Sequence, residues 1–581
     1  MVTTLLPQFQ HQDQYHFPCS SIVADGVDYL ALMCPHQKDA KNIREKIGRL
    51  VARILSLGVF PIALGMDMTY LTCASIAENI RYVLAKTPEQ TAERLKIAQN
   101  CSEARNKCLR GLLAFPQNIL GADMITMHFQ TADRKDMILP LGKLYKSHAE
   151  KMFPSTAEEV ANIIKLAKEQ NRKISIKGAG YAQGKQTLPP GDHDICIDVG
   201  NFKKIEIDVK NKLATVGAGV RWGELQNEAD KHGMATIVQQ ASNVFSIGGS
   251  VGGANCHGWD HRWGSVGNTV VSMQVIRPDG EVVTTKRGDD LFSLVLGGYG
   301  LFGVITEVTL QLTENVPLLV WGEKVEIDDY IDYYRMIQSN PGNYMHLYRL
   351  SIDPKNLLKE GYAQNYSAGN IKSHQTKNLV NEPAEGALRD RIMFQFARHF
   401  PSIVSFWWSH ESKDILTLKK AMRNEIMRPP IEATFNNHSV STTEWLQEYF
   451  LPAEHLADFI RYLGTVLDKN EVKLLNCSIR PVVQDKFSKL GYAKEGERFA
   501  VVLFFTQFLQ NEQVDKTRQW VREVVDKVIE MKGTYYLPYM HFPTRNQFRK
   551  CYPQYKEVVK MKEIYDPQSI FENQLYNEYY R

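Results

Sequence analysis

Glycine dominates one segment of the chain, from Ser246 to Gly267, which reads SIGGSVGGANCHGWDHRWGSVG. Seven of its residues are glycine, and a glycine inside a helix or strand costs about 0.5–1 kcal/mol relative to alanine. A chain keeps so many glycines where its backbone must adopt positive φ or approach something large and flat. A flexible linker is disfavoured, because Ile247, Val251 and Trp259 need burial. The segment therefore predicts a loop wrapped around a bulky cofactor.

Length and charge indicate an ordinary multidomain globular protein. The 581 residues suffice for roughly two to four domains. The 69 basic and 65 acidic residues nearly balance, which argues against a dedicated nucleic-acid binder. The nine cysteines include no Cys-x-x-Cys pair, so neither a disulfide framework nor a metal site is expected, and a cytoplasmic location fits best.

The first 140 residues are expected to form a helical extension, with helical spacing over 38–57 and 89–115. The N-terminus lacks the basic and apolar regions of a signal peptide. Ile54–Met66 is the most apolar run, but its 13 residues are too few to span a bilayer. It favours a buried helix, with docking at the inner face of a membrane as the alternative.

Residues 141–315 are predicted to form a compact α+β module. Ser155 and Glu158 form an expected capping box before a helix whose apolar face is Val160, Ile163, Ile164 and Ala167. Strands are expected at 173–177, 194–198 and 302–312, two strands within 202–220, a hairpin over 270–285, and a short helix at 222–232.

The rest of the chain is predicted to form a second α+β domain, over 316–530, and a tail, 531–581, that returns to the first. Strands are expected at 473–482 and 498–505, and a helix at 514–531. Residues 354–395 are polar and irregular and predict a long loop or flap.

The segment GAGYAQGK at 178–185 fails both common phosphate-binding patterns. A P-loop needs glycine where Ala179 stands and Ser or Thr where Gln186 stands. A dinucleotide fingerprint needs glycine where Gln183 stands, and Pro189-Pro190 prevents the helix that should follow. What remains is a strand that leads into a glycine turn, whose backbone N–H groups can cradle an anion.

Three glycine-rich segments in order carry a resemblance to a known family: KGAGYAQGKQT, SIGGSVGGANCHGWDHRWGSVGNTV and LGGYGLFGVITEV. Over about 150–312 the chain resembles the FAD-binding module of the vanillyl-alcohol oxidase superfamily, and most of all the decaprenylphosphoryl-ribose oxidases. The resemblance implies a two-subdomain FAD-binding module of the p-cresol methylhydroxylase (PCMH) type, an α+β cap domain over the reactive face of the flavin, and FAD as cofactor.

The resemblance also implies which residues hold FAD. Its pyrophosphate would lie against the turn formed by Gly178, Ala179, Gly180, Tyr181, Ala182, Gln183 and Gly184. The ribityl chain and pyrophosphate would follow Ser246, Ile247, Gly248, Gly249, Gly252 and Gly253, and the isoalloxazine ring would lie at Asn255, Cys256, His257 and Gly258. The backbone of Gly303, Val304 and Ile305 would contact the flavin or the adenine.

Departures from the family patterns shape the remaining expectations. Lactone oxidases attach the flavin to a histidine where this chain has Tyr181, so noncovalent FAD is expected. Tyr539 stands where the ribose oxidases have a catalytic lysine, and Glu448 near their cap glutamine. The catalytic candidates are Tyr539, His541, Glu448 and Tyr536, with Asn476 and Arg480 as further pocket residues. The tail lacks the HPRWGK-like motif of lactone oxidases, which disfavours that activity.

The expected function is FAD-dependent oxidation of a hydroxyl group in a sugar, a polyol or a lipid-linked alcohol, by hydride transfer to flavin N5. Two alternatives stay open. One is flavin-dependent reduction of a carbon–carbon double bond, as in the related sterol reductases. The other is a flavin-fold protein that acts as a binding or host-interaction module. The electron acceptor does not follow from the sequence.

Overall fold

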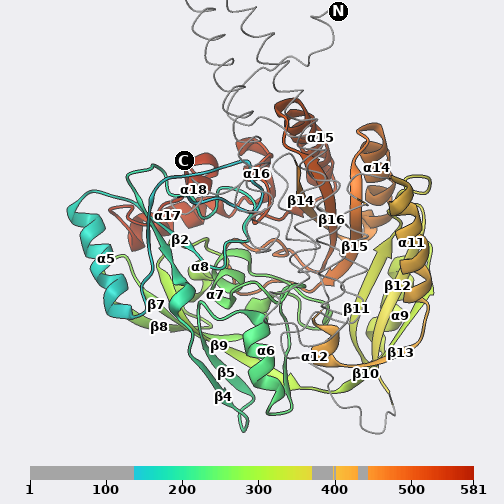
Figure 1. Ribbon diagram of the computed structural model, residues 1–581, viewed down its shortest axis with the longest axis horizontal. Helices are drawn as coiled ribbons and strands as arrows, with labels where there is room; N and C mark the ends of the chain where they lie inside the picture. Colours follow the sequence, from blue (N-terminus) through green and yellow to red (C-terminus); the bar gives the residue numbers. More distant parts are fainter. Residues whose placement is uncertain (1–136, 370–396, 398–400, 429–441) are drawn as a thin grey trace, which may run out of the picture.

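The computed structural model describes residues 137–369, 397, 401–428 and 442–581. The predicted helices at 38–57 and 89–115 and the apolar run at 54–66 lie outside these residues. The described chain has an α+β architecture built on three sheets of three, six and eight strands. In Figure 1 the two smaller sheets lie at one end of the molecule and the eight-stranded sheet at the other.

The first sheet is parallel, with β1 (Glu150–Met152), β3 (Ile195–Asp198) and β2 (Ile174–Lys177) in that order. The helix α5 (Ala157–Glu169) buries Val160, Ile164 and Ala167 as expected, whereas Ile163 is only partly buried. The predicted capping box was displaced by one residue. The helix begins at Ala157, so Thr156 accepts from the N–H of Glu159, and the carboxylate of Glu159 caps in return.

The second sheet is antiparallel, in the order β4 (Ile205–Asp208), β5 (Leu213–Gly217), β9 (Val304–Glu314), β7 (Val270–Ile276) and β8 (Val282–Lys286). A short strand, β6 (Met234–Thr236), also pairs with β9. The helices α6 (Trp222–Asp230) and α8 (Asp290–Val295) complete the module. The predicted hairpin is confirmed as β7 and β8.

The long glycine segment is not wholly a loop. It begins with a helical turn, α7 (Ile247–Gly249), which continues as a π-turn, η3 (Ser250–Ala254). Ile247 and Val251 are four residues apart, and both are fully buried, so their packing supports helical geometry despite the glycines. Asn255, with a φ of 40°, ends the turn in the left-handed region.

The third sheet is antiparallel and carries eight strands. Its order is β13 (Lys419–Met422), β10 (Pro317–Lys324), β12 (Gly361–Ala368), β11 (Asn343–Leu350), β15 (Lys473–Val482), β16 (Arg498–Phe508), β14 (Thr442–Leu451) and β17 (Thr534–Tyr535). The expected loop at 354–395 was wrong for 361–368, which form β12. That strand is stabilised by pairing with both β10 and β11, a long-range effect that local polarity does not reveal.

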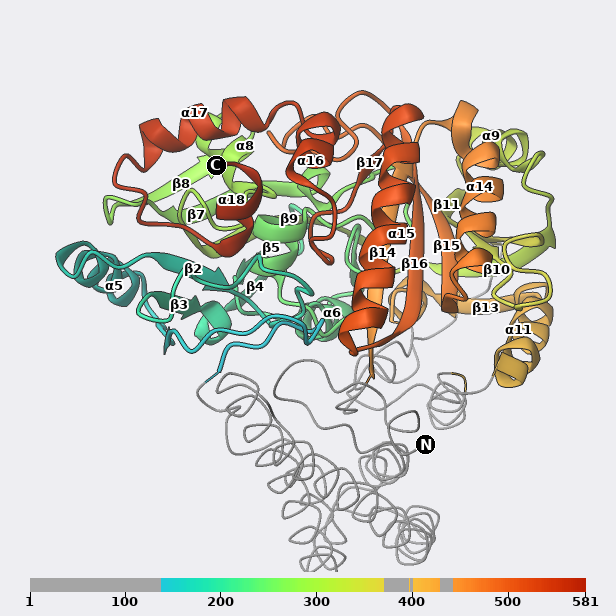
Figure 2. The same cartoon turned by 90° about the horizontal axis from the view of Figure 1, so that it is seen from above.

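Helices cover one face of this sheet. Figures 1 and 2 show α14 (Leu456–Lys469) and α15 (Asn511–Glu530) beside β14, β15 and β16. Tyr449 of β14 packs edge-on against Phe459, and Phe505 of β16 against Trp520. The helices α9 (Tyr330–Ser339), α11 (Pro401–Ile415) and α12 (Arg423–Ile426) lie toward the β10–β13 end. The other face of β14, β15 and β16 is turned toward the glycine-rich segments.

The tail joins the two ends of the molecule. Its strand β17 pairs with β14, and α16 (Arg545–Cys551), α17 (Tyr555–Tyr565) and α18 (Gln574–Tyr579) follow. The N–H of Ile174 in β2 donates to Ile570 at 2.7 Å, and Glu572 donates back at 2.9 Å. Figure 2 shows α17 and α18 over the end formed by the smaller sheets. The tail therefore holds both sheet systems together.

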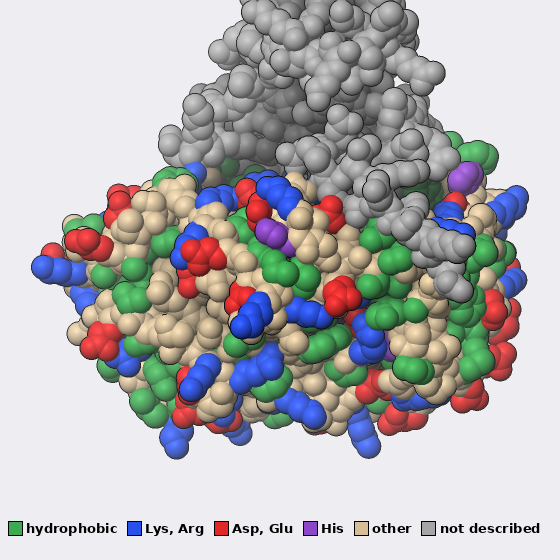
Figure 3. Space-filling model, turned by 90° about the horizontal axis from the view of Figure 1, so that it is seen from below, with side chains coloured by type: hydrophobic (Ala, Val, Ile, Leu, Met, Phe, Trp, Pro, Cys, Tyr) green, Lys and Arg blue, Asp and Glu red, His purple; other side chains and the backbone are tan. Residues whose placement is uncertain are grey.

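On the face shown in Figure 3, basic and acidic side chains are intermixed over the described surface. None of the helices in the described ranges is both long enough and apolar enough to cross a membrane.

Candidate functional site

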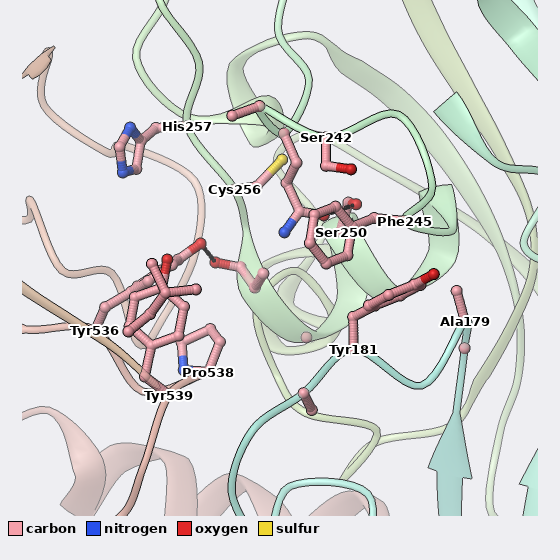
Figure 4. A pocket seen from close by; sticks show the side chains of 18 of the residues that line it. Ala179, Tyr181, Ser242, Phe245, Ser250, Cys256, His257, Tyr536, Pro538 and Tyr539 are labelled. Carbon is pink, nitrogen blue, oxygen red and sulfur yellow. Dashed lines mark hydrogen bonds between the residues drawn. The ribbon is translucent and has the colours of Figure 1, made fainter. Parts of the chain in front are cut away.

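A cavity of about 460 Å³ lies between the glycine-rich segments and the eight-stranded sheet. Its volume falls in the range of small-molecule and cofactor sites, ~300–1,000 Å³. The first glycine turn, the α7–η3 segment and the turn before β9 form one part of its wall, and the sheet and the tail form the other. Figure 4 shows Tyr536, Pro538 and Tyr539 of the tail on one side, and Tyr181, Phe245 and Ser250 on the other.

The glycine part of the wall is open where a large group must approach. Gly180 has a φ of +84°, a conformation that favours glycine. A Cβ built on Gly253, which lines the cavity, would meet nothing within 4 Å. Gly178 has no such room, because a Cβ added there would lie 2.3 Å from Ser246 Oγ. That hydroxyl oxygen accepts a hydrogen bond from the N–H of Ala179 at 3.0 Å. These backbone surfaces fit an extended cofactor with anionic oxygens, as FAD is.

Most of the predicted cofactor residues line this cavity. They are Gly178, Ala179, Gly180, Tyr181, Ala182, Ser246, Gly248, Gly249, Gly252, Gly253, Cys256, His257, Gly303 and Ile305. Gln183, Gly184, Ile247, Asn255, Gly258 and Val304 do not line it. Two of these join structural elements instead. Gln183 exchanges hydrogen bonds with the backbone of β14, and Asn255 donates to Asp485 at 3.0 Å.

Sequence reasoning missed part of the cofactor wall. Gln240, Ser242, Phe245, Tyr299 and Gly300 also line the cavity. The turn at 297–300 carried a visible signal, since its glycines Gly297 and Gly300 both adopt positive φ. The segment before Ser246 carries no comparable pattern, so only the fold shows that it lies at the cavity.

The sheet side of the cavity is one pleated face, because alternate residues of a strand share a face. Glu448 of β14 and Ser478 of β15 both pair with Val502 of β16. The residues of this face that line the cavity are Leu446, Glu448, Val502, Phe504, Asn476, Ser478, Arg480, Leu347, Arg349, Gln364 and Tyr366. The expected pocket residues Asn476 and Arg480 are among them, whereas Arg349, Gln364 and Tyr366 were missed.

Glu448 and His257 meet in this cavity from opposite walls. His257 Nε2 is hydrogen-bonded to Glu448 Oε1, and both residues are buried. An ionised carboxylate only accepts hydrogen bonds, so Nε2 of His257 then carries the hydrogen. His257 Nδ1 is buried without a hydrogen-bond partner among the described residues. The two residues form an acid–base pair at the boundary between the cofactor wall and the sheet.

Tyr536 and Tyr539 border this pair. Burial raises the pKa of Tyr536 and of Tyr539 well above the ordinary value of 10, and in each case the charge of Glu448 acts in the same direction. Both phenols are therefore protonated at neutral pH and serve as hydrogen-bond donors rather than bases. Tyr536 donates to the carbonyl of Ala254 at 2.9 Å. The phenol of Tyr539 interacts instead with the side chain of Glu448. Burial likewise raises the pKa of the neighbouring Cys256 thiol.

His541 does not line the cavity. Its Nδ1 accepts from the N–H of Lys185 at 3.2 Å, and its Nε2 lies 3.2 Å from the carbonyl of Leu537. Burial lowers the pKa of His541 to about 3. A neutral histidine bonded on both sides to backbone holds the tail against the first glycine turn.

Two family models match successive parts of the chain. Residues 151–286 match the family model of the FAD binding domain, and residues 309–579 match that of D-arabinono-1,4-lactone oxidase. The chain is 28% identical to the L-gulonolactone oxidase of Mus musculus, over 29% of this chain and 38% of the relative. It is 30% identical to the decaprenylphosphoryl-beta-D-ribose oxidase of Mycolicibacterium smegmatis, over 33% of this chain and 42% of the relative.

A longer match, at 28% identity, is with the mitochondrial D-lactate dehydrogenase [cytochrome] 1 of Saccharomyces cerevisiae, over 66% of this chain and 64% of the relative. The chain spans only about a third of the length of several other curated relatives that it matches.

Proposed function

Because the chain belongs to the vanillyl-alcohol oxidase superfamily of FAD-binding proteins, we propose that it oxidises a hydroxyl-bearing carbon of a sugar-derived or related small substrate. One observation carries the proposal. A single cavity joins the glycine-lined cofactor wall to a sheet face that presents Glu448, held by His257, beside the phenol of Tyr539.

Oxidation of an alcohol requires an acceptor for the hydroxyl proton and an acceptor for two electrons. Bound FAD would accept the two electrons. Glu448 is the best candidate to accept the hydroxyl proton, because it is a carboxylate in the cavity whose negative charge is stabilised by the N–H of His257. The raised pKa of Tyr539 suits it to donate a hydrogen bond that orients the substrate oxygen. His541, whose nitrogens both face backbone, takes no part in this scheme.

We further propose that FAD is held without a covalent bond. The position that carries the flavin-linked histidine in lactone oxidases is Tyr181, whose ring packs edge-on against Phe245 at a centroid distance of 4.9 Å. Acid precipitation of the purified yellow protein should release the colour into the supernatant. Colour that stays in the pellet would contradict noncovalent binding.

The activity is tested by anaerobic mixing of the FAD-loaded protein with sugars, aldonolactones, polyols, 2-hydroxy acids and lipid alcohols. Loss of the oxidised flavin absorbance with any of these supports the proposal. Reduction by NAD(P)H followed by reoxidation with an enone would instead support double-bond reduction. A protein that binds FAD but is reduced by none of these donors would contradict the proposal.

A further inference from the structure

Two arginines share the substrate side of the cavity. Arg349 lies on β11 directly opposite Ser478 of β15. Arg480 is two residues beyond Ser478 and therefore lies on the same face of the sheet, diagonal to Arg349. Both line the cavity. Side chains diagonal across an antiparallel pair are ~7–8 Å apart at their bases, within reach of two long guanidinium groups.

The positive charge of these two arginines is incompletely matched. Arg349 is paired with Glu411 of α11 at 2.6 Å, and Glu411 also accepts from the indole of Trp407 at 3.1 Å. Arg480 makes no hydrogen bond or ion pair with any residue in the described ranges. Among the carboxylates, Glu448 has the strongest electrostatic effect on Arg480, but it is hydrogen-bonded to His257. The Nε atoms of Arg349 and Arg480 are both buried without a partner there.

Two neighbouring cations that are partly removed from water are unfavourable unless an anion joins them. Burial lowers the pKa of Arg480, and the charge of Arg349 acts in the same direction, while Glu448 opposes it. Asn476, two residues before Ser478 along β15, also lines the cavity, and its side-chain oxygen lacks a partner among the described residues. Guanidinium groups bind carboxylates and phosphates through parallel hydrogen bonds, whereas an amide oxygen needs a donor such as a hydroxyl.

We propose that Arg349 and Arg480 form a subsite for an anionic group of the substrate, and that Asn476 binds a hydroxyl of the same molecule. The inference rests on the proposed function and narrows its substrate class to hydroxylated acids, either carboxylates or phosphate esters. Arg480 on β15 and Glu448 on β14 flank β16, so the acidic group and the hydroxyl to be oxidised would lie on opposite sides of that strand.

The subsite can be tested without turnover. FAD-loaded protein is titrated with malonate and, separately, with inorganic phosphate, and binding is followed by the flavin absorbance difference spectrum and by the melting temperature. The two probes distinguish a carboxylate from a phosphate preference. At least one should perturb the spectrum, and Arg349→Gln and Arg480→Gln should each weaken its binding by at least 10-fold. Arg461→Gln on α14, outside the cavity, is the matched control and should leave binding unchanged.

Three results would overturn the subsite: no binding of either probe, equal binding by both arginine variants and the parent, or equal binding of a neutral polyol. Arg480→Lys keeps the charge but loses the planar fork. If Arg349→Gln does not fold, Arg480→Lys provides the second test of the subsite. Its affinity for the anion should lie between those of the parent and Arg480→Gln. The outcomes separate the subsite from the activity. Turnover of neutral sugars that is insensitive to both arginines would refute the subsite alone, and arginine-dependent anion binding without any flavin reduction would refute the proposed activity alone.

Discussion

His257 and Glu448 are hydrogen-bonded to each other although 191 residues separate them in the chain. His257 belongs to the glycine segment, and Glu448 is in the middle of β14. The imidazole is further enclosed by Phe450, Tyr492 and Tyr536, with ring centroids 5.7–6.1 Å away. The pair is therefore held rigidly, and it fixes a carboxylate at the junction of the cofactor wall and the substrate side of the cavity.

Glu448→Gln should slow flavin reduction by substrate while the protein keeps its fold and its FAD. Glutamine preserves size and hydrogen bonding to His257 but cannot accept a proton, and loss of a general base lowers rates by roughly 10²–10⁴-fold. The measurement is the anaerobic flavin-reduction rate. Glu444→Gln, also buried on β14 but outside the cavity, is the control. Equal rates in the Glu448 variant and the parent would remove Glu448 from the mechanism.

Tyr539→Phe should have a smaller effect. The phenol remains protonated because its pKa is raised, so its removal deletes a hydrogen bond to the substrate oxygen rather than a base. A hydrogen bond to a charged group contributes ~1.5–3 kcal/mol, which corresponds to roughly a 10-fold to 100-fold slower reduction. Tyr535→Phe, buried nearby but not lining the cavity, should change the rate little. A Tyr539 variant with parental rate and melting temperature would show that the phenol does not contact the substrate.

Gly253→Val should lose FAD without losing the fold. A side chain at this position would project into open cavity space rather than into protein atoms, so it competes with the cofactor alone. The ratio of flavin to protein after purification should fall, and the melting temperature should drop to that of the FAD-free parent, because ligand binding stabilises the native state. Gly464→Ala in α14, where an added Cβ makes ordinary contacts, is the control. Full flavin occupancy in Gly253→Val would place FAD elsewhere.

His541 should make the protein less stable in mild acid. Burial lowers its pKa to about 3 in the folded state, whereas an unfolded histidine titrates near 6.5. The unfolded state binds more protons between these values, so stability is full above about pH 6.5 and falls as the pH drops toward 3. At pH 5 the loss is about 2 kcal/mol.

His541→Gln tests this effect, because glutamine keeps a donor and an acceptor but does not titrate. The decrease in melting temperature between pH 7 and pH 5 should be smaller in this variant than in the parent. An identical decrease in both proteins would assign the acid sensitivity to other groups.

Much of the local structure around the cofactor wall followed from the sequence. The strands β2, β3, β7 and β9 and the helix α5 were predicted from alternation, helical spacing and turn residues, which act within a few positions. The glycines of the first turn marked the cofactor wall for the same reason, since Gly180 needs a backbone conformation that few other residues adopt. The helical turn at 247–254 escaped prediction because buried packing of Ile247 and Val251 outweighs the low helix propensity of glycine.

The substrate side of the cavity was decided by tertiary structure. The sequence marked Glu448, Asn476 and Arg480 as candidates, but nothing local indicates that Arg349 and Gln364 share their face, because register between strands depends on pairing across long loops. Tertiary structure also decided the role of His541. Its position two residues after Tyr539 suggested that both side chains face the same site. Neighbouring residues of an irregular segment face different surroundings, and packing turned Tyr539 to the cavity and His541 to the backbone of Lys185. Backbone conformation is thus encoded locally, whereas the contacts that make a catalytic group depend on which distant segments the fold brings together.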